Sequence, residues 1–402
     1  MSSSLCETYI QSLLKRYTRM KLANLRDVRR SWLYHGDEPP NMAESMLGSI
    51  VFKSWKRCLQ SGLEAYQKSI PENILSGHIL QSRIDQRNDL ITLAKPTMNY
   101  LHALMSGCGG VVLLSDHQGV IVHSVGDAEF INKADRVLLK TGASWLEKHR
   151  GTNAIGTALI EGRAVAINGS EHYLENNSFL SCAAAPIYQP NGRISGVLDI
   201  STDKNAYHPH TIGLIKATVH SLEKQLFHAH DDEYRVILKV HPNAEGLGSI
   251  AEGLVGLNDE GLIIGCDRAA LSYLGIAPID IGSVKLQQIV DISLNRVFDQ
   301  AKHGPQPQQL RTHTDRTLFL SFTISDYYRH SHPTTTLDTL PIEAPAISEV
   351  TPAENLVEFG RLRELSKLAI EKTLVKTNGN ISLAAKMLGI SRNTLYRYLR
   401  ND

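Results

Sequence analysis

The 402-residue sequence predicts a multidomain α+β protein. Three observations lead to this prediction. Apolar positions recur at helical spacing in the first hundred residues, β-rich runs with Gly-containing turns follow from residue 108, and a helical segment closes the chain beyond a proline-rich stretch. The composition, 42% hydrophobic and 21% charged, is that of an ordinary globular protein. We therefore expect several folded domains in series.

The N-terminal region, residues 1–100, is expected to be mostly helical. Its apolar positions recur through Ile50, Trp55 and Leu59, and the pattern returns around Leu90. From residue 108 the period changes. GGVVLLSDHQGVIVHSVGD consists of two β-rich runs around a polar turn, which predicts a hairpin.

A first sheet domain is expected over residues 101–228. After the hairpin we predict a helix near 131–149. Two strands follow, CAAAPIYQ and GRISGVLDIST, joined by a Pro-Asn-Gly turn at residues 190–192. Residues 209–230 predict a long amphipathic helix.

A second α+β unit is expected over residues 246–328. LVGLNDEGLIIGCDRAALSYLG reads as strand, turn, strand and helix, and TLFLSFTIS reads as a closing strand. The run HAHDDE, which begins at His228, follows the long helix and precedes a predicted linker. Residues 331–356 lack periodicity and are rich in proline and threonine, which predicts a second linker before a domain at 357–402.

The C-terminal domain has the pattern of a helix-turn-helix. A helix over 359–378 ends at Gly379, Ser382 is placed to cap a second helix, Gly389 suits the tight turn, and Ser391 is placed to cap a third helix. An Arg/Asn-rich first turn on that third helix is typical of major-groove recognition. The residues expected to contact DNA are Ser391, Arg392, Asn393, Thr394, Tyr396, Arg397 and Arg400.

Charge supports this interpretation. The chain carries a formal net charge of +1, but residues 361–402 hold nine Lys and Arg against three acidic residues, so the remainder of the chain is net negative. Basic charge is thus concentrated where base contacts are predicted. The alternative is an ordinary helical hairpin with a solvated basic face.

The C-terminal motifs closely resemble the Fis-type DNA-binding domain of bacterial enhancer-binding activators. The run from Gly379-Asn380 through Ala384-Ala385 to Leu388–Tyr396 carries the resemblance. It implies a homodimer, formed largely by the first helix of the domain, that presents two recognition helices to a palindromic operator.

The resemblance extends upstream. SWKRCLQSGL, WLEKHRGTNAIGTAL, EHYLENNSFLSCAAAPI and GRISGVLDIST resemble the sensory half of activators of acetoin and glycerol catabolism. That resemblance implies a GAF domain with a helical N-terminal lead, followed by a PAS-like domain. In the full family an ATPase that remodels sigma-54 RNA polymerase precedes the DNA-binding domain. The phosphate-binding motif G-x-x-x-x-G-K-[ST] is missing here, because the sequence contains no Gly-Lys dipeptide, so we expect no motor domain.

A GAF domain can hold a small ligand, and the family implies a small polar metabolite such as a diol, ketone or alcohol. Polar or aromatic groups near the signature segments are the candidates for lining such a pocket, with Gly151 and Gly156 allowing tight turns beside it. The alternative is that GTNAIGT is purely structural. The pocket candidates are Trp145, His149, Asn153, Thr157, His172 and Cys182.

No enzyme activity is predicted. Cys182 is a conceivable reactive thiol, but its run SCAAAP reads as a buried strand. HAHDDE reads as a solvated helix end rather than a metal site, and GLGSIAEG lacks the βαβ context of a dinucleotide loop. Five scattered cysteines without a CxxC pair fit reduced thiols. We expect no cofactor, no metal and no membrane span, and a cytoplasmic, nucleoid-associated location.

The sequence therefore predicts a transcription regulator that binds DNA and a small-molecule effector and acts by occupancy. It could repress, recruit the housekeeping RNA polymerase, or compete with a full-length paralogue. An alternative is an accessory protein that heterodimerises with, or antagonises, a full-length sigma-54 activator. A second alternative is a redox enzyme built on the GAF domain, with Cys182 as its nucleophile.

Overall fold

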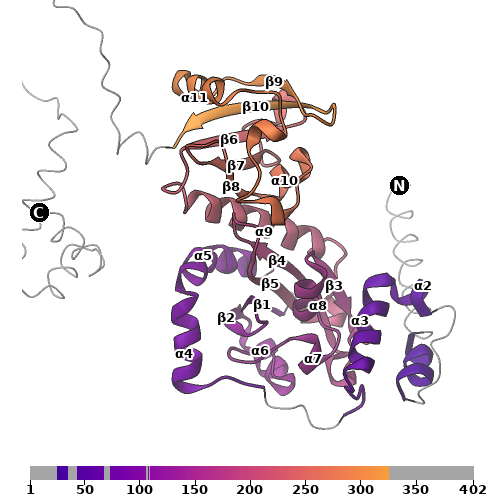
Figure 1. The fold of residues 1–402 in the computed structure, drawn as a ribbon. Helices are drawn as coiled ribbons and strands as arrows, with labels where there is room; N and C mark the ends of the chain where they lie inside the picture. The colour runs from indigo at the N-terminus through magenta and orange to yellow at the C-terminus, as the bar shows by residue number, and fades with distance from the viewer. Residues whose placement is uncertain (1–24, 35–42, 68–72, 106, 108, 326–402) are drawn as a thin grey trace, which may run out of the picture. The chain divides into compact units, whose positions relative to one another are not determined.

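The computed structural model describes residues 25–34, 43–67, 73–105, 107 and 109–325. The chain divides into two compact units, Met1–Thr335 and Thr336–Asp402, and all described residues lie in the first. The predicted linker and helix-turn-helix lie outside the described residues. Within the first unit two β-sheets are formed, each with its own helices (Figure 1).

The first sheet is antiparallel and five-stranded, in the order β2-β1-β5-β4-β3. Its strands are β1 (Gly110–Asp116), β2 (Ile121–Gly126), β3 (Val165–Asn168), β4 (Leu180–Tyr188) and β5 (Ile194–Asp203). The helices around it are α2 (Ala43–Leu47), α3 (Ser49–Gln60), α4 (Gly77–Gln86), α5 (Asn88–Leu104), α6 (Ala128–Ala134), α7 (Glu147–Arg150), α8 (Ala154–Glu161) and α9 (Thr211–His228).

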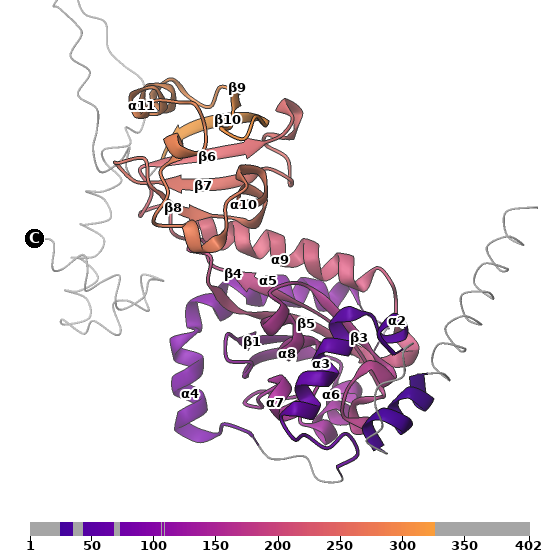
Figure 2. The same ribbon diagram turned by 45° about the vertical axis from the view of Figure 1, so that its right-hand side comes forward.

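One face of this sheet is covered by α5 and α9 (Figures 1 and 2). Both helices place apolar residues at three- and four-residue spacing, which builds a continuous apolar stripe against the strands. The helical residues buried there are Leu90, Ile91, Ala94, Met98, Leu101, Ile215, Val219, Leu222 and Leu226. Because α5 crosses the boundary predicted at residue 100, its last turns pack as part of the sheet domain.

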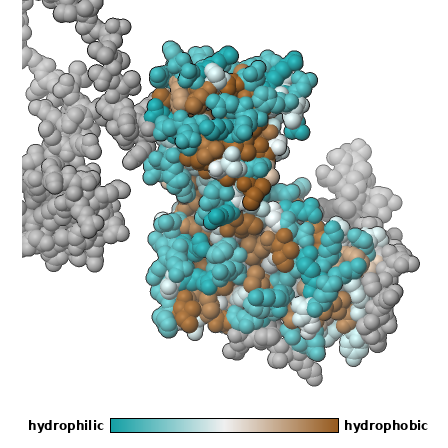
Figure 3. Space-filling model, in the orientation of Figure 1, coloured by the Kyte–Doolittle hydropathy of each residue, from teal (hydrophilic) through white to brown (hydrophobic). Residues whose placement is uncertain are grey.

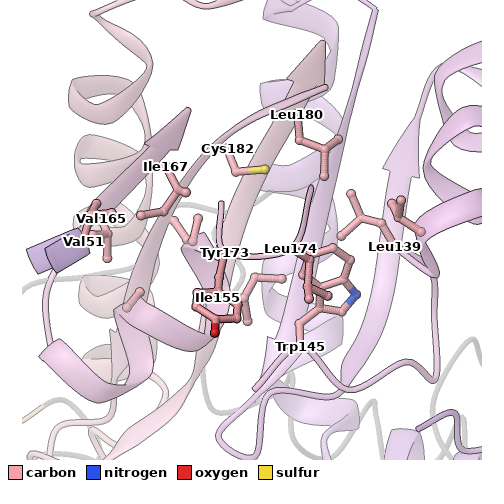
Figure 4. Close-up of a cluster of buried hydrophobic side chains, with 14 of the residues drawn as sticks. Val51, Leu139, Trp145, Ile155, Val165, Ile167, Tyr173, Leu174, Leu180 and Cys182 are labelled. Atoms are coloured by element: carbon pink, nitrogen blue, oxygen red, sulfur yellow. The ribbon is translucent and has the colours of Figure 1, made fainter. Parts of the chain in front are cut away.

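The opposite face is covered by short helices and loops. We call residues 138–161 and 169–179 the cap; they contain α7, α8 and the single turns η3 (Gly169–Glu171) and η4 (Glu175–Asn177). Figure 4 shows the apolar cluster beneath the cap, where Trp145 and Leu174 lie with Leu139 and Leu180. The helix α3 packs its buried Trp55 into the same cluster.

The sequence predictions for this domain are mostly confirmed. The hairpin is β1–β2, the two later strands are β4 and β5, and the long helix is α9. The helix predicted near 131–149 is wrong. The helix ends by Val137, after which Leu138 adopts left-handed geometry (φ 59°) and the chain runs through turns to α7.

The physical reason is that tertiary contacts outweigh local helical periodicity. Gly142 (φ 91°) lies against Leu75, where a Cβ would stand 2.4 Å from the Leu75 carbonyl oxygen. The Trp145 amide donates to the Gly119 carbonyl at 2.8 Å, which ties this loop to the β1–β2 turn. No continuous helix satisfies both contacts.

The second sheet is also antiparallel and five-stranded, in the order β8-β7-β6-β10-β9. Its elements are β6 (Val236–His241), β7 (Gly253–Leu257), β8 (Ile263–Cys266), α10 (Arg268–Leu274), α11 (Leu294–His303), β9 (Gln308–Arg311) and β10 (Thr317–Ile324). The predicted strand-turn-strand-helix is β7, β8 and α10, and the predicted closing strand is β10.

Strand β6 corrects the sequence analysis, which placed a linker before residue 246. It pairs with both β7 and β10 and so occupies the centre of the sheet. Alternate residues Val236, Leu238 and Val240 are buried in the core. The short VILKVH run carries the two-residue period of a strand, but it is flanked by charged and polar segments that favoured a linker.

On the face of the molecule in Figure 3, apolar residues are interspersed with hydrophilic ones. No helix among the described residues is both long enough and apolar enough to span a bilayer.

Candidate functional site in the cap

The cap draws its polar groups together around Glu147, a residue that the sequence analysis did not single out. The Glu147 Oε1 atom accepts hydrogen bonds from Ser54 Oγ at 2.6 Å and Thr157 Oγ1 at 2.7 Å. Arg57 donates from Nε to Glu147 Oε2 at 2.8 Å and from Nη2 to Oε1 at 2.9 Å. This buried carboxylate thus joins α3, α7 and α8 into one polar network.

Asn153 and Thr157 have protein partners in the structure. Asn153 caps α8, because its Oδ1 accepts from the Gly156 amide at 2.8 Å while its Nδ2 donates to the Gly151 carbonyl at 2.7 Å. Thr157 belongs to the Glu147 network. Gly156 has no room for a side chain, since a Cβ there would lie 2.6 Å from the Trp145 carbonyl oxygen.

Trp145 and His149 lie at the start of the cap. The buried Trp145 donates from Nε1 to the Leu138 carbonyl at 3.0 Å, which fixes the indole beneath the loop. The His149 Nδ1 atom lies 2.8 Å from Ser144 Oγ. Burial lowers the pKa of His149, and the neighbouring Lys148 and Arg150 lower it further.

His172 is completely buried in the second cap segment. Its Nδ1 lies 3.0 Å from the Gly169 carbonyl oxygen, an acceptor, so Nδ1 carries the proton and Nε2 is a bare acceptor. Burial lowers the pKa of His172 to about 4, so the ring is neutral at physiological pH. The Nε2 atom has no hydrogen-bond partner within the described structure.

Cys182 lies on β4 under the cap (Figure 4). The Ser201 Oγ atom lies 3.0 Å from its sulfur and 2.6 Å from Asp199 Oδ2 on the neighbouring strand. Burial raises the pKa of the Cys182 thiol well above its usual value, and the nearby Asp199 carboxyl adds to the effect. A nucleophilic cysteine needs the opposite shift. Cys182 also lines a cavity of about 20 Å³, the size of one water molecule.

Asp199 is a second buried acid that sequence reasoning missed. Burial raises its pKa to about 7, partly offset by the hydrogen bond from Ser201. The signal was available in GRISGVLDIST, where a carboxylate interrupts an otherwise apolar strand. In β5 the alternation puts Asp199 and Ser201 on the cap side, with Leu198 and Ile200 facing α5 and α9.

Arg150 and Asn177 were also missed. Both are 0% exposed. All three guanidinium nitrogens of Arg150, and both amide atoms of Asn177, lack a hydrogen-bond partner among the described residues. Arg150 stands directly beside the predicted His149, in the run EKHRGTN, where a basic residue next to a Gly-Thr turn was the available signal.

The six predicted pocket residues therefore all lie in the cap or directly beneath it. They come from the loop before α7, from α7, from the N-cap and body of α8, from the segment after η3, and from β4. Cys182 is hydrogen-bonded to Ser201 and does not belong to the Glu147 network. The predicted DNA-contacting residues, from Ser391 to Arg400, lie outside the described residues. Within the described ranges no group of three or more His, Cys, Asp or Glu side chains is arranged to hold a metal ion.

Comparison with known families gives two matches. Residues 30–224 match the MimR N-terminal domain, and residues 361–400 match the bacterial regulatory protein, Fis family. The chain thus contains a region similar to the MimR N-terminal domain, followed by a region similar to the Fis-type helix-turn-helix.

Several curated relatives share these regions. The acetoin dehydrogenase operon transcriptional activator AcoR of Bacillus subtilis is 34% identical over 183 residues, 46% of this chain and 30% of its own length. The acetoin catabolism regulatory protein of Cupriavidus necator is 30% identical over 290 residues, 68% of this chain and 42% of its own length. The propane 2-monooxygenase operon transcriptional activator MimR of Mycolicibacterium smegmatis is 31% identical over 182 residues, 45% of this chain and 30% of its own length.

The chain spans less than half the length of these relatives. These relatives are named as transcriptional regulators. Among solved structures, the Escherichia coli DhaR(N)–DhaL complex contains a chain that aligns over 68% of this chain and 99% of its own, at 14% identity and a TM-score of 0.43.

Proposed function

We propose that this chain is a sequence-specific DNA-binding transcription regulator that responds to a small-molecule effector. The observation that carries the proposal is the presence, in one chain, of a MimR N-terminal domain and a Fis-type helix-turn-helix. Relatives that align with the first domain are named as regulators of acetoin catabolism and of the propane 2-monooxygenase operon. We infer that the first sheet domain is a GAF sensory domain and the second a PAS-like domain, acting in the cytoplasm.

DNA recognition in this proposal belongs to the third helix of the C-terminal domain. Arg392 and Asn393 stand in its first turn, where Arg donates to guanine and Asn pairs with adenine in the major groove. Arg397 and Arg400 supply phosphate contacts. A homodimer would place two such helices on a palindromic operator.

Regulation in this proposal works by occupancy of the operator. The sequence has no G-x-x-x-x-G-K-[ST] loop to bind the phosphates of ATP, so a sigma-54 motor is not available from these residues. The chain then represses, recruits the housekeeping RNA polymerase, or competes with a full-length paralogue. An effector acts only through a difference in its affinity for two conformations of the sensory domains.

The same missing motif favours a second candidate, an accessory protein that heterodimerises with a full-length sigma-54 activator. Size-exclusion chromatography with light scattering, on the chain mixed with such a relative, separates the two. A species that contains both chains and has a mass between those of the two homodimers supports the accessory role. Exclusive self-association, together with operator binding by the chain alone, supports the regulator.

The DNA-binding test uses the full chain and operators found by genome-wide mapping of bound sites. Arg392→Ala and Asn393→Ala should each weaken operator binding by about 1–3 kcal/mol and relax the preference at one base pair. The matched control is Arg296→Ala, an exposed arginine on α11, which should leave affinity unchanged. Site preference that survives both substitutions would exclude these residues from base reading, and failure to bind any duplex at low salt would refute the proposal.

A further inference from the structure

Two segments of the cap run side by side and bury polar groups that have no hydrogen-bond partner among the described residues. The Tyr173 amide donates to the Thr152 carbonyl at 3.2 Å, which joins residues 145–152 to residues 171–178. Gly151 makes the close approach possible, since a Cβ there would lie 2.6 Å from the Tyr173 Cβ. Arg150 comes from the first segment, and His172 and Asn177 come from the second.

Arg150 has more unpartnered polar atoms in the described structure than His172 or Asn177 has. Its side chain is fully buried, yet none of its guanidinium nitrogens has a hydrogen-bond partner in the described structure. Arginine retains its proton in proteins, and although burial lowers the pKa of Arg150 to about 10, the group remains a cation at neutral pH. A buried cation without a counter-ion is strongly unfavourable, so the site is incomplete without an anion.

Arg57 is an arginine of this region whose charge is paired within the protein. It extends from α3 toward α7, the helix that carries Arg150, and forms ion pairs with Glu147 at 2.8 Å and Glu161 at 3.1 Å. Glu147 lies three residues before Arg150, but its carboxylate oxygens accept hydrogen bonds from Arg57, Ser54 and Thr157. The cap therefore matches one arginine with internal carboxylates and leaves the other unmatched.

The second segment offers groups of complementary chemistry. Asn177 holds a free amide N–H₂ and a free carbonyl oxygen, and its backbone amide is fixed by the Leu174 carbonyl at 3.0 Å. The His172 Nε2 atom is a bare acceptor, because the other ring nitrogen donates to Gly169. An amide and a neutral imidazole suit a hydroxyl or carbonyl beside a carboxylate.

We propose that the cap encloses the effector site and that the effector is a small organic anion, with its carboxylate on Arg150 and a neighbouring hydroxyl or keto oxygen on the Asn177 amide. This inference rests on the proposed effector-responsive function and names the ligand class of that site. It differs from the neutral diols, ketones and alcohols that the family resemblance implies. The ligand enters by local opening of the cap, which is built from single turns and short helices rather than from long ones.

The test compares ligands of the same carbon skeleton that carry either a carboxylate or a neutral hydroxymethyl group. Thermal unfolding of the full chain is followed in about 10 mM lactate or 1,2-propanediol, and in pyruvate or hydroxyacetone, at constant ionic strength. We expect the carboxylates to raise the melting temperature by about 2 °C or more and the neutral partners to leave it unchanged. If the neutral compounds stabilise the protein and the carboxylates do not, or if no carboxylate gives a shift, the proposal is wrong.

Two variants locate the anion. Arg150→Met should abolish the carboxylate-induced shift, and without ligand its melting temperature should rise, because an unpaired buried cation has been replaced by an apolar side chain of similar length. Arg57→Met is the matched control and should lower the melting temperature, since it leaves Glu147 without its ion-pair partner. A carboxylate shift retained in Arg150→Met, or a fall in its ligand-free melting temperature, would overturn the assignment.

Operator binding is measured on the same samples without ligand. If the wild-type chain shows no carboxylate-induced shift but still binds its operator, the anion site alone is refuted. Loss of DNA binding in the wild-type chain refutes the proposed regulator instead, so the two failures are distinguishable.

Discussion

The two faces of the first sheet bury very different chemistry. Against α5 and α9 the strands present a continuous apolar surface, with Leu198 and Ile200 of β5 among its members. Against the cap the same strand presents Asp199 and Ser201. The cap adds further buried polar groups of its own, namely Glu147, Arg150, Thr157, His172 and Asn177.

The two kinds of burial serve different purposes, since apolar burial stabilises the fold and buried polar groups can recognise a ligand. Apolar burial stabilises a fold without requiring exact partners, whereas each buried charge must be matched or it destabilises the protein. Replacing buried ionic groups by apolar ones is often neutral or stabilising, so their retention needs another reason. We infer that the α5/α9 face contributes stability alone, and that the cap face, which also buries an apolar cluster, keeps its additional polar groups for a ligand.

The largest expected effect compares one leucine from each face. Leu222→Ala on α9 should lower the free energy of unfolding by about 4 kcal/mol, and Leu174→Ala in the cap should lower it by about 2 kcal/mol. Both values lie within the usual range for buried leucines. The loss is smaller in the cap because short turns collapse onto a cavity more readily than a long helix does. Urea unfolding followed by circular dichroism measures both. Equal losses would show that the cap is as rigid as the helical face.

The next effect is the pH dependence that Asp199 contributes on the cap side of the sheet. Asp199 has a folded pKa of about 7 against 3.8 for the free side chain, so between these values the folded state holds a proton that the unfolded state has lost. Stability therefore falls as pH rises through this window and is level above it. Asp199→Asn keeps the shape and removes the titration.

The difference in unfolding free energy between Asp199→Asn and the wild type should thus grow by roughly 3 kcal/mol in favour of the variant from pH 4 to pH 8. Only this difference is informative, because Glu223 on α9 also has a pKa raised to about 7 by burial and titrates in both proteins. A difference that stays constant with pH would mean that Asp199 is ionised in the folded protein throughout the range.

The sequence predicted the elements whose signals are local. The β1–β2 hairpin, β4, β5 and α9 follow from apolar periodicity and turn residues, because those strands and that helix bury the face that the pattern marks. The helix near 131–149 was wrong, since Gly142 and Trp145 are held by contacts to Leu75 and Gly119 that no local pattern encodes.

The candidate site was predicted only in outline. The signature segments pointed to the cap, but polar residues were chosen there by type, and a residue type does not reveal whether its partners lie inside the protein. Asn153 and Thr157 have internal partners, whereas Arg150 has none in the described structure. That distinction depends on how α7 packs against α3 and the second cap segment, which only the fold provides.

The smallest expected effect tests how far the cap depends on a single capping residue. Asn153→Ala should cost about 1 kcal/mol, because the Gly156 amide at the start of α8 loses its acceptor. Asn153→Ser retains a side-chain oxygen that can accept from this amide without burying a charge, so it should cost less than Asn153→Ala. Urea unfolding of both variants, beside Asp267→Ala at the equivalent N-cap of α10 in the second sheet domain, measures the effect. If Asn153→Ala matches the wild type while Asp267→Ala is destabilised, the α8 cap contributes nothing, and the cap is held by the Glu147 network and its apolar cluster instead.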